Sequence, residues 1–315
     1  MNTVNGKGDV VCIGESMVLV TPMNGQRLAD ARCAALTVAG AESTVALYLA
    51  DLGHRVRWLS RVGADPLGDH VLHEIGRGGV DVGLVVRDPR APTGVYFKDP
   101  APAATSVYYY RAGSAASRLS EADLQRLDPA TTAVVHLSGI TPALSPTCRA
   151  MAERAFTLAA AAGVLRSFDV NHRAALWQAA DAGPALLEFA RWADIVFVGL
   201  DEANRLWGVR TPEEVREHVG NGPTLVVKDS DVGATAFADG AHAFVPADAV
   251  EVVEPVGAGD AFAAGYLSGL LRGWDQSARL RLGHRVAALA LRTMADHADA
   301  SALRAVAPTE LESGS

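Results

Sequence analysis

Six short β-prone runs, spread along the chain and mostly separated by helix-like segments, constrain the fold more than any other feature. Such alternation is the pattern of a parallel sheet, because two parallel neighbours need a crossover that is long enough to hold a helix. We therefore predict an α/β fold with a central, mostly parallel sheet and helices on both faces. The six runs cover residues 10–13, 56–60, 133–137, 165–168, 195–198 and 224–227.

Two of the intervening segments carry specific helix signals. Residues 145–161 are rich in Ala and have helical spacing. Further along, Thr211 is followed by Pro212 and Glu214, which is typical of a helix that has Thr as its N-cap and Pro as its first residue. We predict helices at both places.

The stretch from Thr93 to Arg111 has no helical period. Two β-prone pieces, residues 93–97 and 106–110, flank the Pro- and Ala-rich residues 99–105, which predicts an antiparallel hairpin with a loose tip. A hairpin inserted into a parallel α/β chain is a candidate lid over the open edge of the sheet. We expect residues from about 14–22 and 93–112 to form this β lid.

Composition limits the organisation and the classes of partner. The 315 residues are 49% hydrophobic, which is ample for a buried core, and we predict one α/β domain over residues 1–310 with a disordered tail at 311–315. The formal net charge is −8 and no run of Lys or Arg stands out, which disfavours binding to nucleic acid or to an anionic membrane. No apolar stretch is long enough to cross a bilayer, so we expect a cytoplasmic protein.

The cysteines indicate a reducing compartment. Cys12, Cys33 and Cys148 are odd in number and far apart. They lack the paired spacing of zinc ligands and do not form a disulfide framework. We interpret them as ordinary core residues.

A glycine-rich turn before a helix-forming segment is the main candidate for chemistry. Residues 254–260 read Glu-Pro-Val-Gly-Ala-Gly-Asp, and a strong helix former follows them. Gly257 and Gly259 would let backbone N–H groups point at one spot at the helix N-terminus, where a phosphate is favoured. Taken by itself, however, the tetrapeptide that ends at Asp260 is better explained as a tight turn with Asp as the helix N-cap.

The rest of the chain changes the balance between these interpretations. The turn resembles the C-terminal signature of the ribokinase-like (PfkB-type) carbohydrate kinases, and order and spacing match that family from Gly14 to about Ala300. The N-terminal motifs that resemble the family are Gly40-Ala41-Glu42, Leu52-Gly53-His54, residues 61–68 and residues 79–82. The resemblance implies a ribokinase-like fold with a small β lid, ATP and Mg²⁺ as cofactors, an anion hole at Gly257, Ala258 and Gly259, and Asp260 as the catalytic base.

Such kinases mainly position a hydroxyl in line with the γ-phosphate and neutralise the charge that spreads over the phosphate oxygens. The base need not be strong. An Asp of ordinary pKa can accept a proton that leaves late in the reaction, provided that it lies within hydrogen-bond reach of the hydroxyl.

Residues 108–117, 136–144 and 169–173 resemble the members of this family that phosphorylate 2-keto-3-deoxygluconate at its terminal hydroxyl. A sugar acid needs a cation, and a guanidinium binds a carboxylate through two parallel hydrogen bonds. Arg111 and Arg173 supply such groups. The resemblance implies a substrate site made of Gly40, Tyr96, Tyr109, Tyr110, Arg111, Arg173, Asp260 and Asp296, with Thr44 where the family has Asn.

Several of these residues have a structural alternative. Residues 108–110 alternate on a predicted strand, so at least one faces away from any ligand, and we expect contact from Tyr109 or Tyr110 because Tyr combines an apolar ring with a hydroxyl. Asp296 could equally be an exposed acid late in a helix.

The two arginines have alternatives as well. Arg111 could be a solvated strand end, and Arg173 could be a loop ion-pair partner of Asp169. We favour ligand binding for Arg173 because it follows a predicted parallel strand, and ligands of open parallel sheets bind beyond the carboxyl ends of the strands.

The nucleotide side departs from the family pattern. Where the family has Lys-x-Gly-x-x-Gly, residues 228–233 read Lys-Asp-Ser-Asp-Val-Gly. We expect Lys228, Ser230 and Gly233 to border the triphosphate, with Asp229 and Asp231 weakening ATP binding or requiring Mg²⁺ in compensation.

Three further positions on this side are unusual or ambiguous. Gly199 stands where the family has Asn or Ser. Glu202 fits the acid that orders Mg²⁺-bound water, or else is an ordinary acid of a first helical turn. His284 replaces an Asn near the expected adenine edge.

The leading hypothesis is an ATP-dependent kinase of 2-keto-3-deoxygluconate or a related sugar acid. The alternatives are a kinase for a neutral ketose or another deoxy-keto-acid, and a non-catalytic sugar-acid sensor on the same fold. A nicotinamide-dependent oxidoreductase is disfavoured, because no G-x-G-x-x-G follows residues 10–13. The resemblance also implies a homodimer or larger homo-oligomer formed through the lid.

Overall fold

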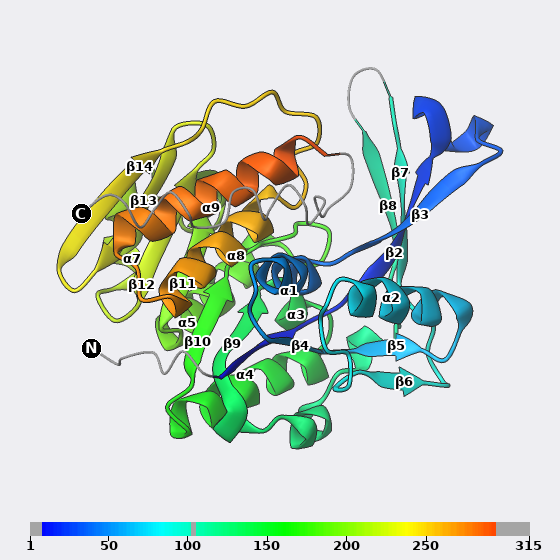
Figure 1. Ribbon diagram of the computed structural model, residues 1–315, viewed down its shortest axis with the longest axis horizontal. Helices are drawn as coiled ribbons and strands as arrows, with labels where there is room; N and C mark the ends of the chain where they lie inside the picture. Colours follow the sequence, from blue (N-terminus) through cyan, green and yellow to red (C-terminus); the bar gives the residue numbers. More distant parts are fainter. Residues whose placement is uncertain (1–7, 102–104, 294–315) are drawn as a thin grey trace.

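The computed structural model describes residues 8–101 and 105–293 and is built on an eight-stranded sheet (Figure 1). The sheet has the order β14-β13-β12-β11-β10-β9-β1-β4, parallel from β12 to β4 and antiparallel at β13 and β14. The parallel part consists of the six predicted strands, which confirms the fold class. The strands are β1 (Asp9–Ile13), β4 (Val56–Leu59), β9 (Thr132–Ser138), β10 (Leu165–Asp169), β11 (Ile195–Gly199), β12 (Thr224–Asp229), β13 (Gly233–Ala238) and β14 (Ala241–Pro246).

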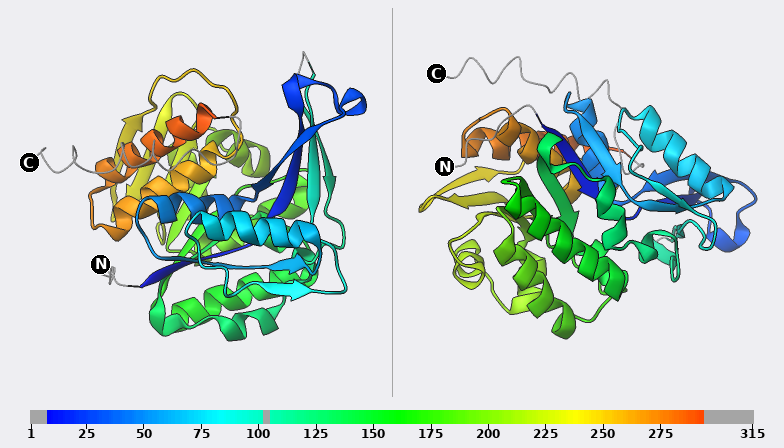
Figure 2. Two further views of the ribbon diagram at one scale, coloured as in Figure 1. Left: turned by 45° about the vertical axis from the view of Figure 1, so that its right-hand side comes forward. Right: turned by 90° about the horizontal axis from the view of Figure 1, so that it is seen from below.

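Helices cover both faces of this sheet (Figure 2). One face packs against α1 (Ala41–Asp51), α8 (Ala258–Leu271) and α9 (Gln276–Leu291), and the other against α4 (Pro146–Ala161), α5 (Ala179–Trp192), α6 (Leu200–Trp207) and α7 (Pro212–Val219). Alternation along the strands explains the two layers: in β1, Val10 and Cys12 enter one core and Val11 and Ile13 the other. Such runs of buried residues are typical of a sheet covered on both sides.

The predicted helix starts are confirmed. Ser145 is the N-cap of α4 and accepts a hydrogen bond from the N–H of Cys148, with Pro at the first helical turn. Thr211 caps α7 and accepts from the N–H of Glu214. In both helices the side-chain oxygen satisfies an N–H group that has no partner inside the helix.

A second, four-stranded sheet projects from the body of the molecule (Figure 1), and we call it the small sheet. Its order is β3-β2-β7-β8, and β7 and β8 form the predicted antiparallel hairpin. The strand β3 was not predicted, because its sequence is Ala-rich and its side chains are mostly exposed or half-buried. The strands are β2 (Met17–Pro22), β3 (Ala34–Ala39), β7 (Val95–Asp99) and β8 (Ser106–Tyr110).

The remaining elements connect these layers. The strands β5 (Arg61–Gly63) and β6 (Val86–Asp88) pair with each other, and α2 (Pro66–Arg77) and α3 (Ile140–Ala143) lie between strands in the chain. Short 3₁₀ turns are η1 (Met23–Gly25), η2 (Leu28–Asp30), η3 (Ala116–Arg118), η4 (Glu121–Arg126) and η5 (Pro129–Thr131). The predicted disordered tail at 311–315 lies outside the described residues.

Two further expectations concern helices and cysteines. Within residues 8–101 and 105–293, every helix is too short or too polar to cross a membrane. All three cysteines are free thiols. Cys12 and Cys148 are buried as predicted, but the expectation for Cys33 was wrong, because it is exposed just before the start of β3.

Candidate active site

Gly257 lies in the glycine-rich turn and is the N-cap of α8, with a φ of +84°. Glycine adopts this left-handed conformation at little cost. In the described part of the chain, the N–H groups of Gly259 and Asp260 have no acceptor, so they can bind an oxyanion with help from the helix dipole. The interpretation of Asp260 as the N-cap was wrong, because Gly257 holds that position and Asp260 lies within the first turn.

The carboxylate of Asp260 is buried and has one side-chain donor. Asn171 follows β10, and its Nδ2 donates to Asp260 Oδ1 at 3.1 Å. Burial, followed by the nearby charge of Asp169, raises the pKa of Asp260 to about 8, although Arg173 and Lys228 act in the opposite direction. A carboxylate with a pKa near neutrality is a stronger base than an exposed one.

Lys228, at the end of β12, lies beside this turn. Its Nζ donates to Asp169 Oδ2 at 2.8 Å, and a Cβ built on Gly259 would lie 3.4 Å from the same Nζ. Burial lowers the pKa of the Lys228 amine, but the surrounding carboxylates, Asp169 first, raise it above its usual value. Lys228 therefore stays protonated and adds positive charge beside the free N–H groups of α8.

Glu202, in the first turn of α6, is engaged by the backbone. Its carboxylate accepts from the N–H of Gly199 at 3.3 Å and from the N–H of His172. Burial, followed by the charge of Asp169, raises its pKa to about 7. These contacts support the alternative of an acid at a helix start, and the water-mediated metal role of Glu202 stays a prediction.

A metal that arrives with a nucleotide fits this donor set better than a resident one does. Across the described ranges, no three acidic, His or Cys side chains come together as a metal site. Mg²⁺ in nucleotide sites commonly takes one or two carboxylates besides phosphate oxygens and water. Asp169, Glu202 and Asp260 are the carboxylates whose charges act on Lys228 in this centre.

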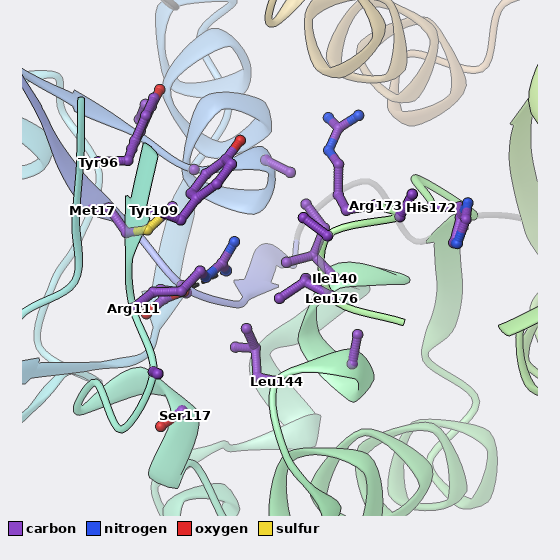
Figure 3. A pocket seen from close by; sticks show the side chains of 18 of the residues that line it. Met17, Tyr96, Tyr109, Arg111, Ser117, Ile140, Leu144, His172, Arg173 and Leu176 are labelled. Carbon is purple, nitrogen blue, oxygen red and sulfur yellow. Dashed lines mark ion pairs between the residues drawn. The ribbon is translucent and has the colours of Figure 1, made fainter. Parts of the chain in front are cut away.

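A cavity of about 660 Å³ lies between the small sheet and the carboxyl ends of the parallel strands (Figure 3). Arg111 and Arg173 enter it from opposite sides, with Tyr96 and Tyr109 on the Arg111 side. Asp260 lines the same cavity, so a ligand held there reaches the turn of α8. Six of the predicted substrate residues line the cavity: Gly40, Tyr96, Tyr109, Arg111, Arg173 and Asp260.

The two arginines differ in their partners. Arg111 forms an ion pair with the buried Glu15, and only 12% of its side chain is exposed, so it is not a solvated strand end. Arg173 is exposed. It has no ion pair among the described residues, and its alternative partner Asp169 pairs with Lys228 instead. Among the described residues, Arg173 is therefore the arginine of this cavity that has no ion-pair partner, whereas Arg111 and Arg205 are paired.

Other predicted substrate residues lie elsewhere. The prediction that Tyr110 contacts the substrate was wrong. Strand alternation puts this residue on the opposite face of β8, where its ring packs edge-on against Phe97 and is 66% exposed. The prediction that Thr44 belongs to the substrate site was also wrong, because Thr44 lies one turn into α1, is buried and does not line the cavity. Asp296 lies outside the described residues. Tyr109 stacks on Tyr96 across the hairpin, with ring centroids 5.3 Å apart.

The predicted nucleotide residues occupy two places. Ser230 and Gly233 lie in and after the β12–β13 turn, near Lys228 in sequence, and both have positive φ, +42° and +151°. His284 is buried in α9, where one ring nitrogen is 3.1 Å from the carbonyl oxygen of Val245 and the ring packs edge-on against Phe262. Its contact with adenine stays a prediction.

We expect that Ser230→Gly raises the free energy of unfolding by about 1 kcal/mol. A non-glycine residue at positive φ is strained by about 1–3 kcal/mol, part of which is offset by the greater freedom of Gly in the unfolded chain. Urea denaturation measures the change. The matched control is Asp231→Gly in the same turn, which should not stabilise, because Asp231 is not at positive φ. Equal effects of the two changes would refute the strain at Ser230.

Sequence reasoning missed three residues of the site. Asn171 binds Asp260, Glu15 pairs with Arg111, and Arg205 of α6 lines the cavity. Asn171 and Glu15 carried a usable signal, since each follows the carboxyl end of a parallel strand, where ligand sites gather. Arg205 carried none, because its ion pair with Asp201 at 2.8 Å is the ordinary pairing of an exposed helix.

The sequence and fold match known proteins over nearly the whole chain. The model of the pfkB family carbohydrate kinase matches residues 7–302. The chain belongs to this family. The cavity, the α8 turn and Lys228 are therefore the candidate active site of a pfkB family carbohydrate kinase.

Three relatives illustrate the range of this family. The 2-dehydro-3-deoxygluconokinase of Bacillus subtilis is 35% identical over 301 residues, covering 92% of this chain and 91% of that protein. The 2-dehydro-3-deoxygalactonokinase of Haloferax volcanii is 33% identical over 319 residues, covering 96% and 95%. The crystal structure of a PfkB protein from Polaromonas sp. JS666 is 34% identical, with a TM-score of 0.85 over 95% of this chain and 99% of that one.

Proposed function

We propose that this pfkB family kinase transfers the γ-phosphoryl group of ATP to the terminal hydroxyl of 2-keto-3-deoxygluconate, also called 2-dehydro-3-deoxygluconate. The observation that carries the proposal is the cavity that Arg111 and Arg173 line from opposite sides and that Asp260 also lines. Two guanidinium groups suit a sugar acid better than a neutral sugar. The similarity to the Bacillus subtilis 2-dehydro-3-deoxygluconokinase supports the same substrate.

In this proposal Arg173 binds the carboxylate of the sugar acid, since it forms no ion pair among the described residues. Arg111 is held by Glu15 and donates its remaining N–H groups to sugar oxygens. The stacked rings of Tyr96 and Tyr109 form a wall with hydroxyl groups. The small sheet carries Tyr96 and Tyr109, and Arg111 directly follows its strand β8, so the sheet acts as the lid that closes over the sugar.

Asp260 acts as the base. Its raised pKa and its hydrogen bond from Asn171 fit a carboxylate that is fixed in one orientation and takes the proton of the substrate hydroxyl. The N–H groups of Gly259 and Asp260, with the Lys228 ammonium, stabilise negative charge on the phosphoryl oxygens. MgATP, when bound, supplies the phosphoryl group and a cation that offsets its charge, with Glu202 and Asp169 as the nearby acids.

A sugar acid of different stereochemistry is the second candidate, because the Haloferax volcanii relative carries the name 2-dehydro-3-deoxygalactonokinase. The two acids share the carboxylate and the terminal hydroxyl, so both offer the groups that Arg173 and Asp260 would contact.

A panel assay tests the proposal. ADP release is measured with 2-keto-3-deoxygluconate, 2-keto-3-deoxygalactonate, gluconate, fructose and ribose, each with MgATP. We expect the highest kcat/KM for one of the two 2-keto-3-deoxy acids. Preference for fructose or ribose would overturn the sugar-acid assignment, and binding of a sugar acid without ADP release would support a sensor instead.

A further inference from the structure

An ion pair joins the small sheet to the turn that precedes α8. Lys98 lies on the same face of β7 as Tyr96, two residues away, and its Nζ is 2.9 Å from Glu254 Oε2. The pair is largely shielded, with 7% of the Lys98 side chain and 16% of the Glu254 side chain exposed. The two residues are 156 positions apart in the chain, so the contact is between the lid hairpin and the body of the molecule.

Glu254 is tied to the phosphate-binding turn at the same time. Its other carboxylate oxygen, Oε1, accepts from the N–H of Val256 at 3.3 Å. The N–H groups of Val253 and Glu254 bond to the carbonyl oxygen of Leu291 at the end of α9, at 2.8 and 3.3 Å. Val256 lines the cavity and is followed by Gly257, the N-cap of α8. The carboxylate of Glu254 therefore bonds both to strand β7 of the small sheet and to the turn before α8.

We propose that Lys98 is a positioning residue for phosphoryl transfer, which acts through Glu254 on the turn at Gly257–Asp260. The inference rests on the kinase activity proposed above and on the role of this turn, but not on which sugar is phosphorylated. When Lys98 holds Glu254, the N–H of Val256 is oriented and the backbone that enters α8 is fixed. The strand that carries Tyr96 against the sugar thereby also sets the geometry at the phosphate.

The physical reason is the cost of leaving either charge without its partner. A shielded ammonium and carboxylate hold each other in one arrangement. If one partner is removed, the other is an unpaired charge that is poorly solvated, so its side chain moves toward water. Here the group that would move is Glu254, three residues before the N-cap of α8. A displacement of about 1 Å in a reacting group can lower a rate about a hundredfold.

Lys98→Met, Lys98→Arg, Glu254→Gln and the double variant Lys98→Met/Glu254→Gln test the proposal, with whichever sugar the wild-type enzyme phosphorylates fastest. We expect each neutral single change to lower kcat about tenfold to a hundredfold. The double variant should be little worse than the singles, because both remove the same contact. Lys98→Arg should restore most of kcat, since a guanidinium also reaches a carboxylate.

A neighbouring ion pair on the same strand supplies the control. Arg27, in the connection between β2 and β3, donates from Nε and Nη2 to Asp99 of β7 at 2.8 and 2.7 Å, and among the described residues neither side chain bonds to the turn before α8. Arg27→Met should keep kcat near the wild-type value. The proposal is overturned if folded Glu254→Gln keeps the wild-type kcat. It is also overturned if the losses of the two single variants multiply in the double variant, or if Arg27→Met lowers kcat as much as Lys98→Met does. A wild-type enzyme that prefers a neutral sugar would refute the sugar assignment only.

Discussion

Asp260→Asn is expected to lower kcat about 10²–10⁴-fold, the usual contribution of a positioned base. The amide keeps the shape of the side chain, and its oxygen can still accept from Asn171 Nδ2, but it cannot take a proton. The KM values for sugar and nucleotide should change little, since the lost interaction belongs to the transition state. Steady-state kinetics measures both constants, and a variant with more than about a tenth of the wild-type kcat would contradict the role of Asp260.

Asp260→Asn should be more stable than the wild-type protein in mildly alkaline solution. This result would show that its activity is not lost through unfolding. The pKa of Asp260 is raised in the folded chain from 3.8 to about 8. Between these values the folded state binds a proton that the unfolded state releases, so this group's contribution to stability is lost as pH rises through that window. Asn does not ionise, so the Tm difference in its favour should grow as pH approaches about 8.

Arg173→Met is expected to raise the KM for the sugar acid about tenfold to a hundredfold. This change corresponds to the loss of about 1.5–3 kcal/mol, the contribution of a hydrogen bond to a charged group. Stability should change little, because Arg173 is exposed and has no ion pair among the described residues. Its charge also lowers the pKa of Asp260, so the pH dependence of the variant should move to higher pH. Kinetics over a pH series measures all three effects.

Arg111→Met is the matched comparison, with the same chemical change on the opposite side of the cavity. It should raise the KM for the sugar acid as well, but it also leaves Glu15 buried without its cation. Loss of one partner of a buried pair costs about 3 kcal/mol or more in stability. If Arg173→Met leaves KM unchanged for the acid, the carboxylate does not bind there, and equal losses of stability in the two variants would contradict the difference in their partners.

The sheet, its helices and the lid hairpin were predictable because they depend on local patterns. Alternation of β-prone runs with helices is sufficient to predict parallel pairing, and the caps at Ser145 and Thr211 follow from single side chains. Strand β3 was missed because exposed Ala-rich sequence gives no period to detect. Its place in the small sheet depends on pairing with β2, which is a tertiary contact.

The site was predicted in part. Residues at the carboxyl ends of strands, such as Arg173, could be placed from order in the chain alone. The orientation of Tyr110 and the depth of Thr44 could not, because each depends on the exact register of a strand or helix against the cavity. The pKa of Asp260 depends on burial and on Asp169, which lies 91 positions away in the chain and has no local sequence signal.

The pH dependence of kcat/KM for the sugar tests most directly whether Asp260, with its raised pKa, is the base. Because the base must be deprotonated to react, kcat/KM should fall about tenfold per pH unit below a pKa of about 8 and level off above it. In Arg173→Met the acidic limb of this pH profile should move to higher pH, because the lost positive charge no longer favours the ionised form of Asp260. A profile that stays flat down to about pH 6, far below that pKa, would contradict Asp260 as a base of raised pKa.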